Sequence, residues 1–163
     1  MQPMTKLEFQ IGDPLRARNL TLATAESCTG GLIASRITDV AGSSDYFVGG
    51  VAAYAYEAKV ELLNVSWDTL KAHGAVSRET VLEMARGVRK TLNANIGISV
   101  SGIAGPGGGL PEKPVGTVWI ALVAPDGEWT KLFHFNGDRL QNKSLAADAA
   151  LEFLIDYLSG KIE

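Results

Sequence analysis

The sequence predicts an α/β domain built around a mixed sheet. Apolar runs typical of buried strands alternate with segments of helical spacing as far as about residue 116. A Pro125-Asp126-Gly127 turn then joins two strand-like runs, as in an antiparallel hairpin, and one long helical pattern follows. This order of elements favours a layered fold in which parallel and antiparallel strands share one sheet. The 163 residues contain no repeat or linker, and we expect a single domain over residues 1–163.

The first part of the chain is expected to begin with a short amphipathic helix. Leu7, Ile11, Leu15 and Leu20 suggest this helix, and Gly12-Asp13-Pro14 interrupts it. We expect the helix to restart there, with Asp13 as its N-cap and Pro14 at its first helical position. Four elements follow: a strand over 20–25, a helix over 29–40, a strand over 46–54 and a helix over 57–64. Gly49 and Gly50 in the second strand indicate a bulge or a close approach of backbone.

The second part of the chain continues this alternation. Ser66 is expected to cap a further turn, and Ser77 begins a long helix to about Asn93. The remaining elements are a strand over 96–100, a Gly/Pro-rich loop over 102–114, strands over 117–124 and 129–135, and a helix over 139–158. The residues expected to face inward on this last helix are Leu145, Ala149, Leu151, Leu154, Ile155 and Leu158.

Composition and charge exclude several classes of function. A net charge of −3 gives no electrostatic basis for binding nucleic acid or an acidic membrane. The one cysteine allows no internal disulfide, which suits a reducing cytoplasm. We expect a cytoplasmic protein, since the first residues lack the apolar segment of a signal peptide and no apolar run reaches membrane-spanning length. Two separated histidines and scattered acids give no spacing typical of a metal site, so we expect no metal.

The strand-to-helix junction over 23–31 holds the strongest candidate for chemistry. Ser27 and Cys28 stand between an apolar strand and the expected helix, just before Gly30 and Gly31. The free N–H groups and the positive dipole at a helix start favour an anion or a developing negative charge. Ser27 is therefore our candidate nucleophile. Cys28 is the alternative nucleophile, although we favour its interpretation as a small buried residue in the first helical turn.

A serine nucleophile needs a base, and Lys59 is the best candidate. His73 is expected in a turn and His134 in a strand of the hairpin, and neither is a convincing base. Lys59 follows the strand that ends at Tyr54, and the carboxyl ends of parallel strands meet at one rim of a sheet. An apolar pocket beside a helix start favours the neutral amine, which can accept a serine proton. Tyr54 is expected to relay that proton or to bind the oxyanion.

A second loop, over 100–109, follows a buried strand and is rich in glycine. Such a loop permits close backbone approach and outward-facing N–H groups, which suit a phosphate or a carboxylate. It matches neither a P-loop nor the dinucleotide fingerprint, since the Gly-Lys-Ser/Thr ending and the required spacing are missing. Lys113 and Arg139 flank the later loops, and either is expected to be able to pair with a phosphate, Arg139 through two bonds.

These motifs together resemble the CinA carboxy-terminal domain family. The matching segments lie in family order over about residues 15–159: 21–31 around Ser27, 42–44, 73–77, 101–106 and 113–118. The resemblance implies a three-layer α/β/α fold with a five-stranded mixed sheet. It also implies nicotinamide-nucleotide amidase activity, in which nicotinamide mononucleotide and water give nicotinate mononucleotide and ammonia without a metal or cofactor. The chain resembles the stand-alone form of the domain, and the family favours a homodimer.

The resemblance assigns roles to individual residues. Ser27 matches the nucleophile, Lys59 the lysine and Tyr54 the tyrosine of active members. Backbone N–H groups near Thr29, Gly30 and Gly31 or in the Gly-rich loop would hold the oxyanion. The residues expected to bind substrate are Thr29, Gly30, Gly31, Ser101, Gly102, Ile103, Ala104, Gly105 and Arg139.

Two further hypotheses come from other classes. The chain departs from the usual family pattern at Ala55 and Tyr56, where a hydroxyl residue and an asparagine are common. This departure favours a catalytically silent module that binds a nucleotide or a partner. The historical name of the family suggests a competence factor that acts on DNA, and the acidic balance of the chain argues against that function.

Overall fold

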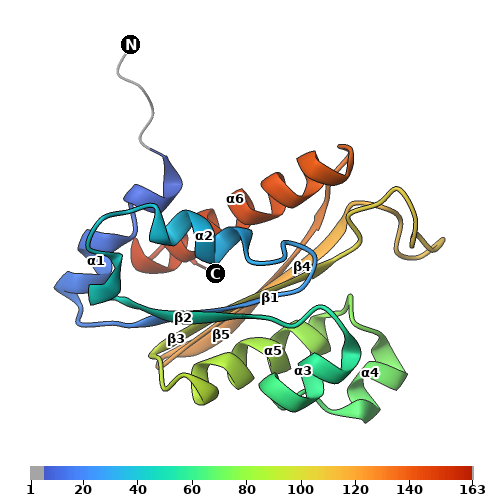
Figure 1. Cartoon of the computed structure of the whole chain (residues 1–163), viewed down its shortest axis with the longest axis horizontal. Coiled ribbons are helices and arrows are strands. Elements are labelled where there is room, and N and C mark those ends of the chain that lie inside the picture. The colour runs from blue at the N-terminus through green and yellow to red at the C-terminus, as the bar shows by residue number, and fades with distance from the viewer. Residues whose placement is uncertain (1–5, 163) are drawn as a thin grey trace.

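The computed structural model describes residues 6–162 and is built around a five-stranded sheet (Figure 1). The strands are β1 (Leu22–Glu26), β2 (Phe47–Ala52), β3 (Ile96–Gly102), β4 (Thr117–Ala124) and β5 (Gly127–His134). Their order in the sheet is β2-β1-β3-β4-β5. β1 pairs in parallel with β2 and β3, whereas β4 pairs antiparallel with β3 and β5. The mixed sheet and the terminal hairpin are therefore confirmed.

Helices cover both faces of this sheet, which makes three layers (Figure 1). One face carries α1 (Gly12–Ala17), α2 (Leu32–Thr38) and α6 (Arg139–Leu158), and the other carries α3 (Tyr56–Leu63), α4 (Trp67–His73) and α5 (Arg78–Thr91). Short 3₁₀ helices lie at Leu7–Phe9 and Ser43–Asp45. Ser66 and Ser77 cap α4 and α5 by accepting the N–H groups of Asp68 and Thr80. Both serines thus begin helices, as their positions in the sequence predicted.

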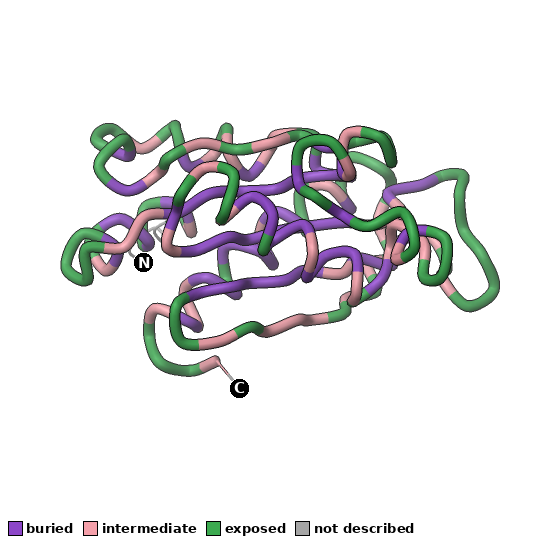
Figure 2. The backbone as a smooth tube through the Cα atoms, turned by 90° about the horizontal axis from the view of Figure 1, so that it is seen from below, coloured by how far each residue is buried: buried purple, intermediate pink, exposed green. Residues whose placement is uncertain are grey.

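Burial follows the order of the strands (Figure 2). All five residues of β1 are buried, and so are six of the seven in β3. Intermediate and exposed residues alternate along β2, at one edge of the sheet. Helices cover both faces of the central strands, so the side chains on both faces of these strands are buried. A strand at the edge of the sheet keeps part of its side chains near solvent.

Two helix starts differ from the sequence predictions. The first α-helix begins at Gly12 with Ile11 as its N-cap, and Asp13 lies inside it, 3.3 Å from Arg16. The second helix begins at Leu32 instead of residue 29, so Cys28 lies in the preceding turn and not in a helical turn. Gly30 and Gly31 have φ values of +61° and +104°, which a right-handed helix excludes.

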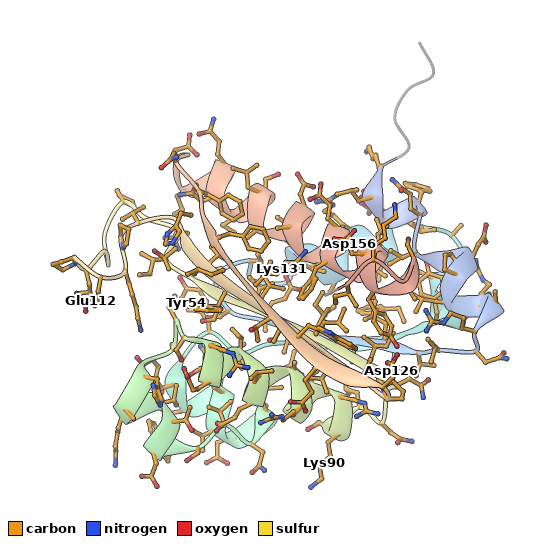
Figure 3. The ribbon with its side chains drawn as sticks, turned by 180° about the vertical axis from the view of Figure 1, so that it is seen from behind. Tyr54, Lys90, Glu112, Asp126, Lys131 and Asp156 are labelled. Carbon is orange, nitrogen blue, oxygen red and sulfur yellow. The ribbon has the colours of Figure 1, made fainter. Side chains whose placement is uncertain are left out.

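The last helix packs closely with small residues. Leu145, which we predicted to face inward, is 40% exposed, and the side against the sheet includes Ala146, Ala147 and Ala150. Its far end is fastened by polar contacts, in which Lys131 of β5 lies 3.4 Å from Asp156 and Tyr157 donates to Asp126 (Figure 3). The helix covers β3 and β4, and its first residue lies at the same end of the sheet as the Gly-rich loop.

The two glycines of β2 make the expected irregularity. The register between β1 and β2 shifts between Leu22 and Ala23, opposite Phe47 and Gly49. A Cβ added to Gly50 would lie 2.3 Å from the hydroxyl oxygen of Thr24. The carboxyl ends of β1 and β2 lie together because the two strands pair in parallel, and Glu26 there pairs with Ala52 on one side and Val100 of β3 on the other.

Candidate functional site

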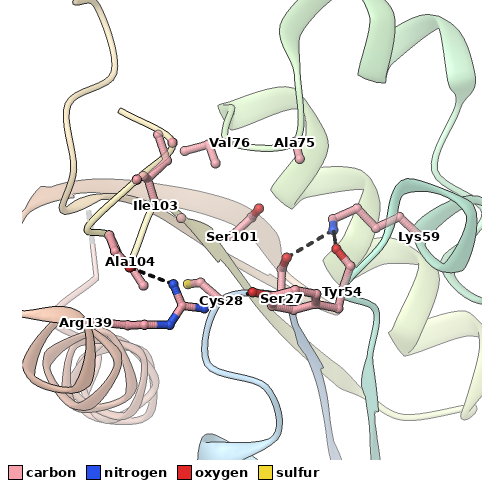
Figure 4. A pocket seen from close by; sticks show the side chains of 14 residues that line it. Ser27, Cys28, Tyr54, Lys59, Ala75, Val76, Ser101, Ile103, Ala104 and Arg139 are labelled. Carbon is pink, nitrogen blue, oxygen red and sulfur yellow. Dashed lines mark hydrogen bonds between the residues drawn. The ribbon is translucent and has the colours of Figure 1, made fainter. Parts of the chain in front are cut away.

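A pocket of about 270 Å³ lies at the carboxyl ends of β1, β2 and β3 (Figure 4). Ser27 directly follows β1, and its N–H donates to the carbonyl of Val100 in β3. Strand ends contribute Ser27, Tyr54 and Ser101, α3 contributes Lys59, and the Gly-rich loop and α6 complete the wall. The lining residues are Ser27, Cys28, Tyr54, Lys59, Ala75, Val76, Ser101, Gly102, Ile103, Ala104, Gly105, Gly107, Gly108 and Arg139.

Lys59 is the one lysine that lines this pocket, and its side chain is buried. Its Nζ lies 3.1 Å from Oγ of Ser27, 2.8 Å from the carbonyl of Ala53 and 3.1 Å from the carbonyl of Tyr54. No carboxylate of the described residues forms a salt bridge with it. Burial therefore lowers the pKa of Lys59 from 10.5 to about 8.

The two carbonyls fix the direction of the amine. A neutral amine has two N–H bonds and one lone pair. A carbonyl oxygen can only accept a hydrogen bond, so it pairs with an N–H of the amine and not with its lone pair. When the carbonyls of Ala53 and Tyr54 take the two N–H bonds, the lone pair of Lys59 is left facing Oγ of Ser27. The arrangement can therefore accept the proton of the Ser27 hydroxyl.

The start of α2 already holds an anion, which is the side chain of Glu26. Its Oε1 accepts the Thr29 hydroxyl at 2.6 Å and the Ile33 N–H at 2.9 Å, and its Oε2 accepts the Ala34 N–H at 3.0 Å. The N–H of Gly30 donates to the carbonyl of Ser27. Thr29, Gly30 and Gly31 are not among the residues that line the pocket. The anion that we expected at this helix start is thus supplied by the chain itself.

Cys28 lines the pocket but is held in its thiol form. Burial is the largest cause that raises the pKa of Cys28 to about 11, and the charge of Glu26 acts in the same direction. A thiol must lose its proton to become a strong nucleophile. The site therefore favours Ser27 over Cys28.

Ser101 places a hydroxyl group in the pocket that has no internal partner. Its side chain is 1% exposed, and within the part of the chain that the structure describes its Oγ makes no hydrogen bond. A buried hydroxyl without a partner costs about 1–3 kcal/mol, which a bound ligand can recover. The loop beyond it contributes Gly102, Ile103, Ala104 and Gly105 to the wall of the pocket.

Arg139 joins the Gly-rich loop to the strand end that carries Tyr54. Its Nη1 donates to the carbonyl of Gly105 at 2.7 Å and its Nη2 donates to the hydroxyl of Tyr54 at 3.0 Å. Tyr54 is 63% exposed and lies across the mouth of the pocket (Figure 4). A guanidinium group carries five N–H donors, so Arg139 keeps donors for a ligand while it holds both neighbours.

Some polar candidates lie elsewhere. Lys113 donates to the carbonyl of His73, the last residue of α4, and does not line the pocket. His73 lies 3.6 Å from Glu79, and His134 lies at the end of β5, 3.5 Å from the Thr117 hydroxyl. Neither histidine lines the pocket.

One part of the pocket wall, formed by the segment after α4, is not marked by the residues alone. Ala75 and Val76 line it, and the N–H of Ala75 donates to the hydroxyl of Tyr56 at 3.3 Å. Small apolar residues have no chemistry that marks them in a sequence, and the segment at 73–77 stands out only through the family resemblance. Among residues 6–162 there is no cluster of three or more metal-ligating side chains, nor a helix long and apolar enough to span a membrane.

Comparison with known proteins places this arrangement in a family. The family model described as the CinA C-terminal domain matches residues 4–158. A putative competence-damage inducible protein of Halothermothrix orenii is 53% identical over 155 residues, which cover 94% of this chain and 38% of the relative. A CinA-like protein of Thermotoga maritima is 48% identical, covering 96% of this chain and 38% of the relative. The chain thus spans little more than a third of the length of these relatives.

Solved structures agree with this assignment over the whole fold. The competence/damage inducible protein of Agrobacterium tumefaciens superposes with a TM-score of 0.90 at 41% identity, covering 94% of this chain and 93% of that one. A CinA superfamily protein of Escherichia coli superposes with a TM-score of 0.90 at 34% identity, covering 93% of this chain and 88% of that one. The chain belongs to the CinA C-terminal domain family.

Proposed function

We propose that the chain is an amidase that hydrolyses nicotinamide mononucleotide to nicotinate mononucleotide and ammonia. The observation that carries this proposal is the contact of 3.1 Å between Nζ of Lys59 and Oγ of Ser27. The lysine is buried and its pKa is lowered to about 8, so about a tenth of it is a neutral base at pH 7. A serine–lysine pair of this kind suits acyl transfer from an amide.

The reaction is proposed to proceed through an acyl-enzyme. Oγ of Ser27 attacks the carboxamide carbon, and its proton passes to Nζ of Lys59. The C–N bond then breaks, and the proton moves to the departing nitrogen with the assistance of Tyr54, so that ammonia leaves. Water next attacks the ester carbon, Lys59 accepts the proton of that water, and Oγ of Ser27 recovers a proton as the carboxylate is released.

The oxyanion and the nucleotide are assigned to Ser101, the Gly-rich loop and Arg139. Ser101 has a buried hydroxyl without an internal partner, and Gly107 and Gly108 make no backbone hydrogen bonds through their N–H groups in the described part of the chain. These donors suit the oxyanion and the polar groups of a ligand, and Gly102, Ala104 and Gly105 line the same part of the pocket. Arg139 at the mouth suits the phosphate, because guanidinium and phosphate pair through two hydrogen bonds.

The direct test measures ammonia release from nicotinamide mononucleotide. Ser27→Ala is expected to lower the rate by at least about a thousandfold, because the covalent step is lost. Ser144→Ala, an exposed serine of α6, is the matched control and should keep the wild-type rate. Equal rates for wild type and Ser27→Ala would exclude the serine mechanism.

A silent binding module is the second candidate function. Its basis is Tyr56, whose hydroxyl accepts the N–H of Ala75 in the pocket wall, at a position where the family commonly has asparagine. Calorimetric binding of the mononucleotide without turnover would support this module, and a Tyr56→Asn variant that gains activity would locate the defect. The homodimer implied by the family resemblance stays a prediction, which light scattering of the purified protein tests.

A further inference from the structure

Glu26 is a buried carboxylate that the proposed mechanism does not use. It is the last residue of β1 and is 1% exposed. No lysine or arginine of the described residues forms an ion pair with it. Three hydrogen-bond donors compensate its charge instead, namely the Thr29 hydroxyl and the N–H groups of Ile33 and Ala34. Burying an ionised group is costly, so a buried carboxylate with three donors requires an explanation.

The side chain of Glu26 closes the turn that carries Ser27. The turn leaves β1 at Ser27 and reaches α2 at Leu32 through Gly30 and Gly31. Glycine has the greatest backbone freedom of all residues, so this turn needs other contacts to hold it. Between those points Glu26 binds the turn through Thr29 and binds α2 through Ile33 and Ala34. The carboxylate therefore fastens the turn to a helix that packs in the core.

Two hydrogen bonds connect the backbone of Glu26 to the side chain of Lys59 through Ala53. Its carbonyl accepts the N–H of Ala53 at 2.9 Å, and the carbonyl of Ala53 in turn accepts Nζ of Lys59 at 2.8 Å. The same residue thus contacts the turn that holds the nucleophile and the peptide unit that holds the base. This double contact is what a serine–lysine pair needs, since a misplacement of about 1 Å can cost a hundredfold in rate.

We propose that Glu26 is a positioning residue that sets Ser27 against Lys59. This inference rests on the proposed function, because it gives Glu26 its effect through the serine–lysine pair. Its charge has a second consequence, which is to disfavour the thiolate of the neighbouring Cys28. Glu26 therefore favours the serine of this turn as the nucleophile in two ways.

The proposal requires a carboxylate and not only a polar side chain. All three neighbouring groups are donors, and a carboxylate accepts at both oxygens. In Glu26→Gln one of those oxygens becomes an NH₂ group that faces another donor. This nearly isosteric change removes one acceptor and the charge while it keeps the volume of the side chain.

The test compares the reactivity of Ser27 in Glu26→Gln with that in Glu83→Gln. Glu83 is the matched control, because its carboxylate accepts a backbone N–H from Ser66 and a hydroxyl from Thr69 at the start of α4, away from the pocket. Each protein is treated with a fluorophosphonate, and peptide mass spectrometry gives the rate and stoichiometry of Ser27 labelling. We expect Glu26→Gln to be labelled at least tenfold more slowly than wild type, to the same stoichiometry. Its kcat for nicotinamide mononucleotide should be at least tenfold lower, and its KM should stay within twofold of wild type. Glu83→Gln should match wild type in rate.

The remaining outcomes distinguish failure of the amidase function from failure of the positioning role of Glu26. Labelling and kcat within twofold of wild type in Glu26→Gln would overturn the positioning role, and so would a loss explained wholly by reduced stoichiometry. If the wild-type protein is labelled at Ser27 but does not hydrolyse nicotinamide mononucleotide, the proposed function fails. The labelling rate of Glu26→Gln then still shows whether Glu26 positions Ser27. A wild type that is not labelled at Ser27 overturns both. If Glu26→Gln does not fold, Thr29→Val, which keeps the carboxylate, is expected to slow labelling at least threefold, and an unchanged rate overturns the proposal.

Discussion

Nζ of Lys59 lies 3.1 Å from Oγ of Ser27, although 32 positions separate the two residues in the sequence. The contact exists because β1 and β2 end side by side, so that Ser27 and Ala53 follow paired residues. The helix that begins at Tyr56 then returns Lys59 over the strand end, with the carbonyls of Ala53 and Tyr54 as its acceptors. A parallel pair of strands thus brings together a nucleophile and a base from separate segments.

The rate of amide hydrolysis is expected to rise with pH through about 8. The pKa of Lys59 is lowered to about 8 by burial, and the amine accepts a proton only when it is neutral. Below that pH the lysine is protonated, so kcat/KM should fall about tenfold for each pH unit further down. A pH profile of kcat/KM checks this expectation. A profile that is flat from pH 6 to 9 would contradict Lys59 as the base.

The stability of the fold is expected to depend on the same group. The folded protein releases the proton of Lys59 near pH 8, whereas the unfolded chain releases it near 10.5. Between these values the unfolded state binds more protons, so the free energy of unfolding rises with pH, by roughly 2–3 kcal/mol in total. Urea unfolding of wild type and Lys59→Met at pH 7 and 10 measures the difference. An equal change in both proteins would show that Lys59 is not the cause.

Cys28 is expected to be dispensable. Its pKa is raised to about 11, so at pH 7 about one thiol in ten thousand is ionised. Cys28→Ala should therefore keep kcat within about threefold, at a stability cost of about 1 kcal/mol for the lost packing. Iodoacetamide should label the folded protein much more slowly than the protein in urea, as measured by mass spectrometry. A loss of activity as large as that of Ser27→Ala would make the thiol the nucleophile instead.

The sequence predicted the elements whose pattern is local and regular. The buried runs of β1 and β3, the hairpin of β4 and β5 and the serine caps of α4 and α5 all carry their signals within a few residues. The start of α2 was predicted three residues early, because Gly30 and Gly31 adopt positive φ values. No local propensity shows that Glu26 reaches forward to cap this helix.

The sequence predicted residues of the candidate site that carry a functional group or belong to the Gly-rich loop, and it did not predict residues that only tertiary packing brings to the pocket. Ser27, Lys59, Tyr54, Ser101 and Arg139 carry functional groups, and the structure brings all five to one pocket. Ala75 and Val76 line the same pocket through the return of the chain after α4, which follows from tertiary packing alone. Lys113 has a phosphate-binding group, yet it is bound to the carbonyl of His73. Residue type therefore indicated which groups could act, and only the fold indicated which of them meet.

Arg139 is expected to discriminate substrates by their phosphate. Arg139→Gln removes the charge and the guanidinium fork, and should raise KM for nicotinamide mononucleotide about tenfold or more. The rate for nicotinamide riboside, which lacks the phosphate, should change by less than about threefold. Steady-state kinetics on the two compounds gives the comparison. Equal losses on both would show that Arg139 acts by holding Tyr54 and Gly105 and not by binding phosphate.

Gly87 is expected to be a position where alanine destabilises a helix. Alanine normally stabilises a helix interior by about 1 kcal/mol relative to glycine. In α5, however, a Cβ at Gly87 would lie 1.8 Å from the carbonyl oxygen of Leu63, so α3 and α5 would have to separate. Gly87→Ala should therefore lower the free energy of unfolding by about 2–3 kcal/mol.

The matched control for this change is Gly107→Ala, since nothing lies within 4 Å of a Cβ built there. It should leave the free energy of unfolding within about 0.5 kcal/mol of wild type. Urea unfolding of the three proteins measures both effects. Because α3 carries Lys59, the separation forced by Gly87→Ala should also slow the serine–lysine chemistry. A Gly87→Ala protein as stable as wild type would show that the two helices are free to move apart at little cost.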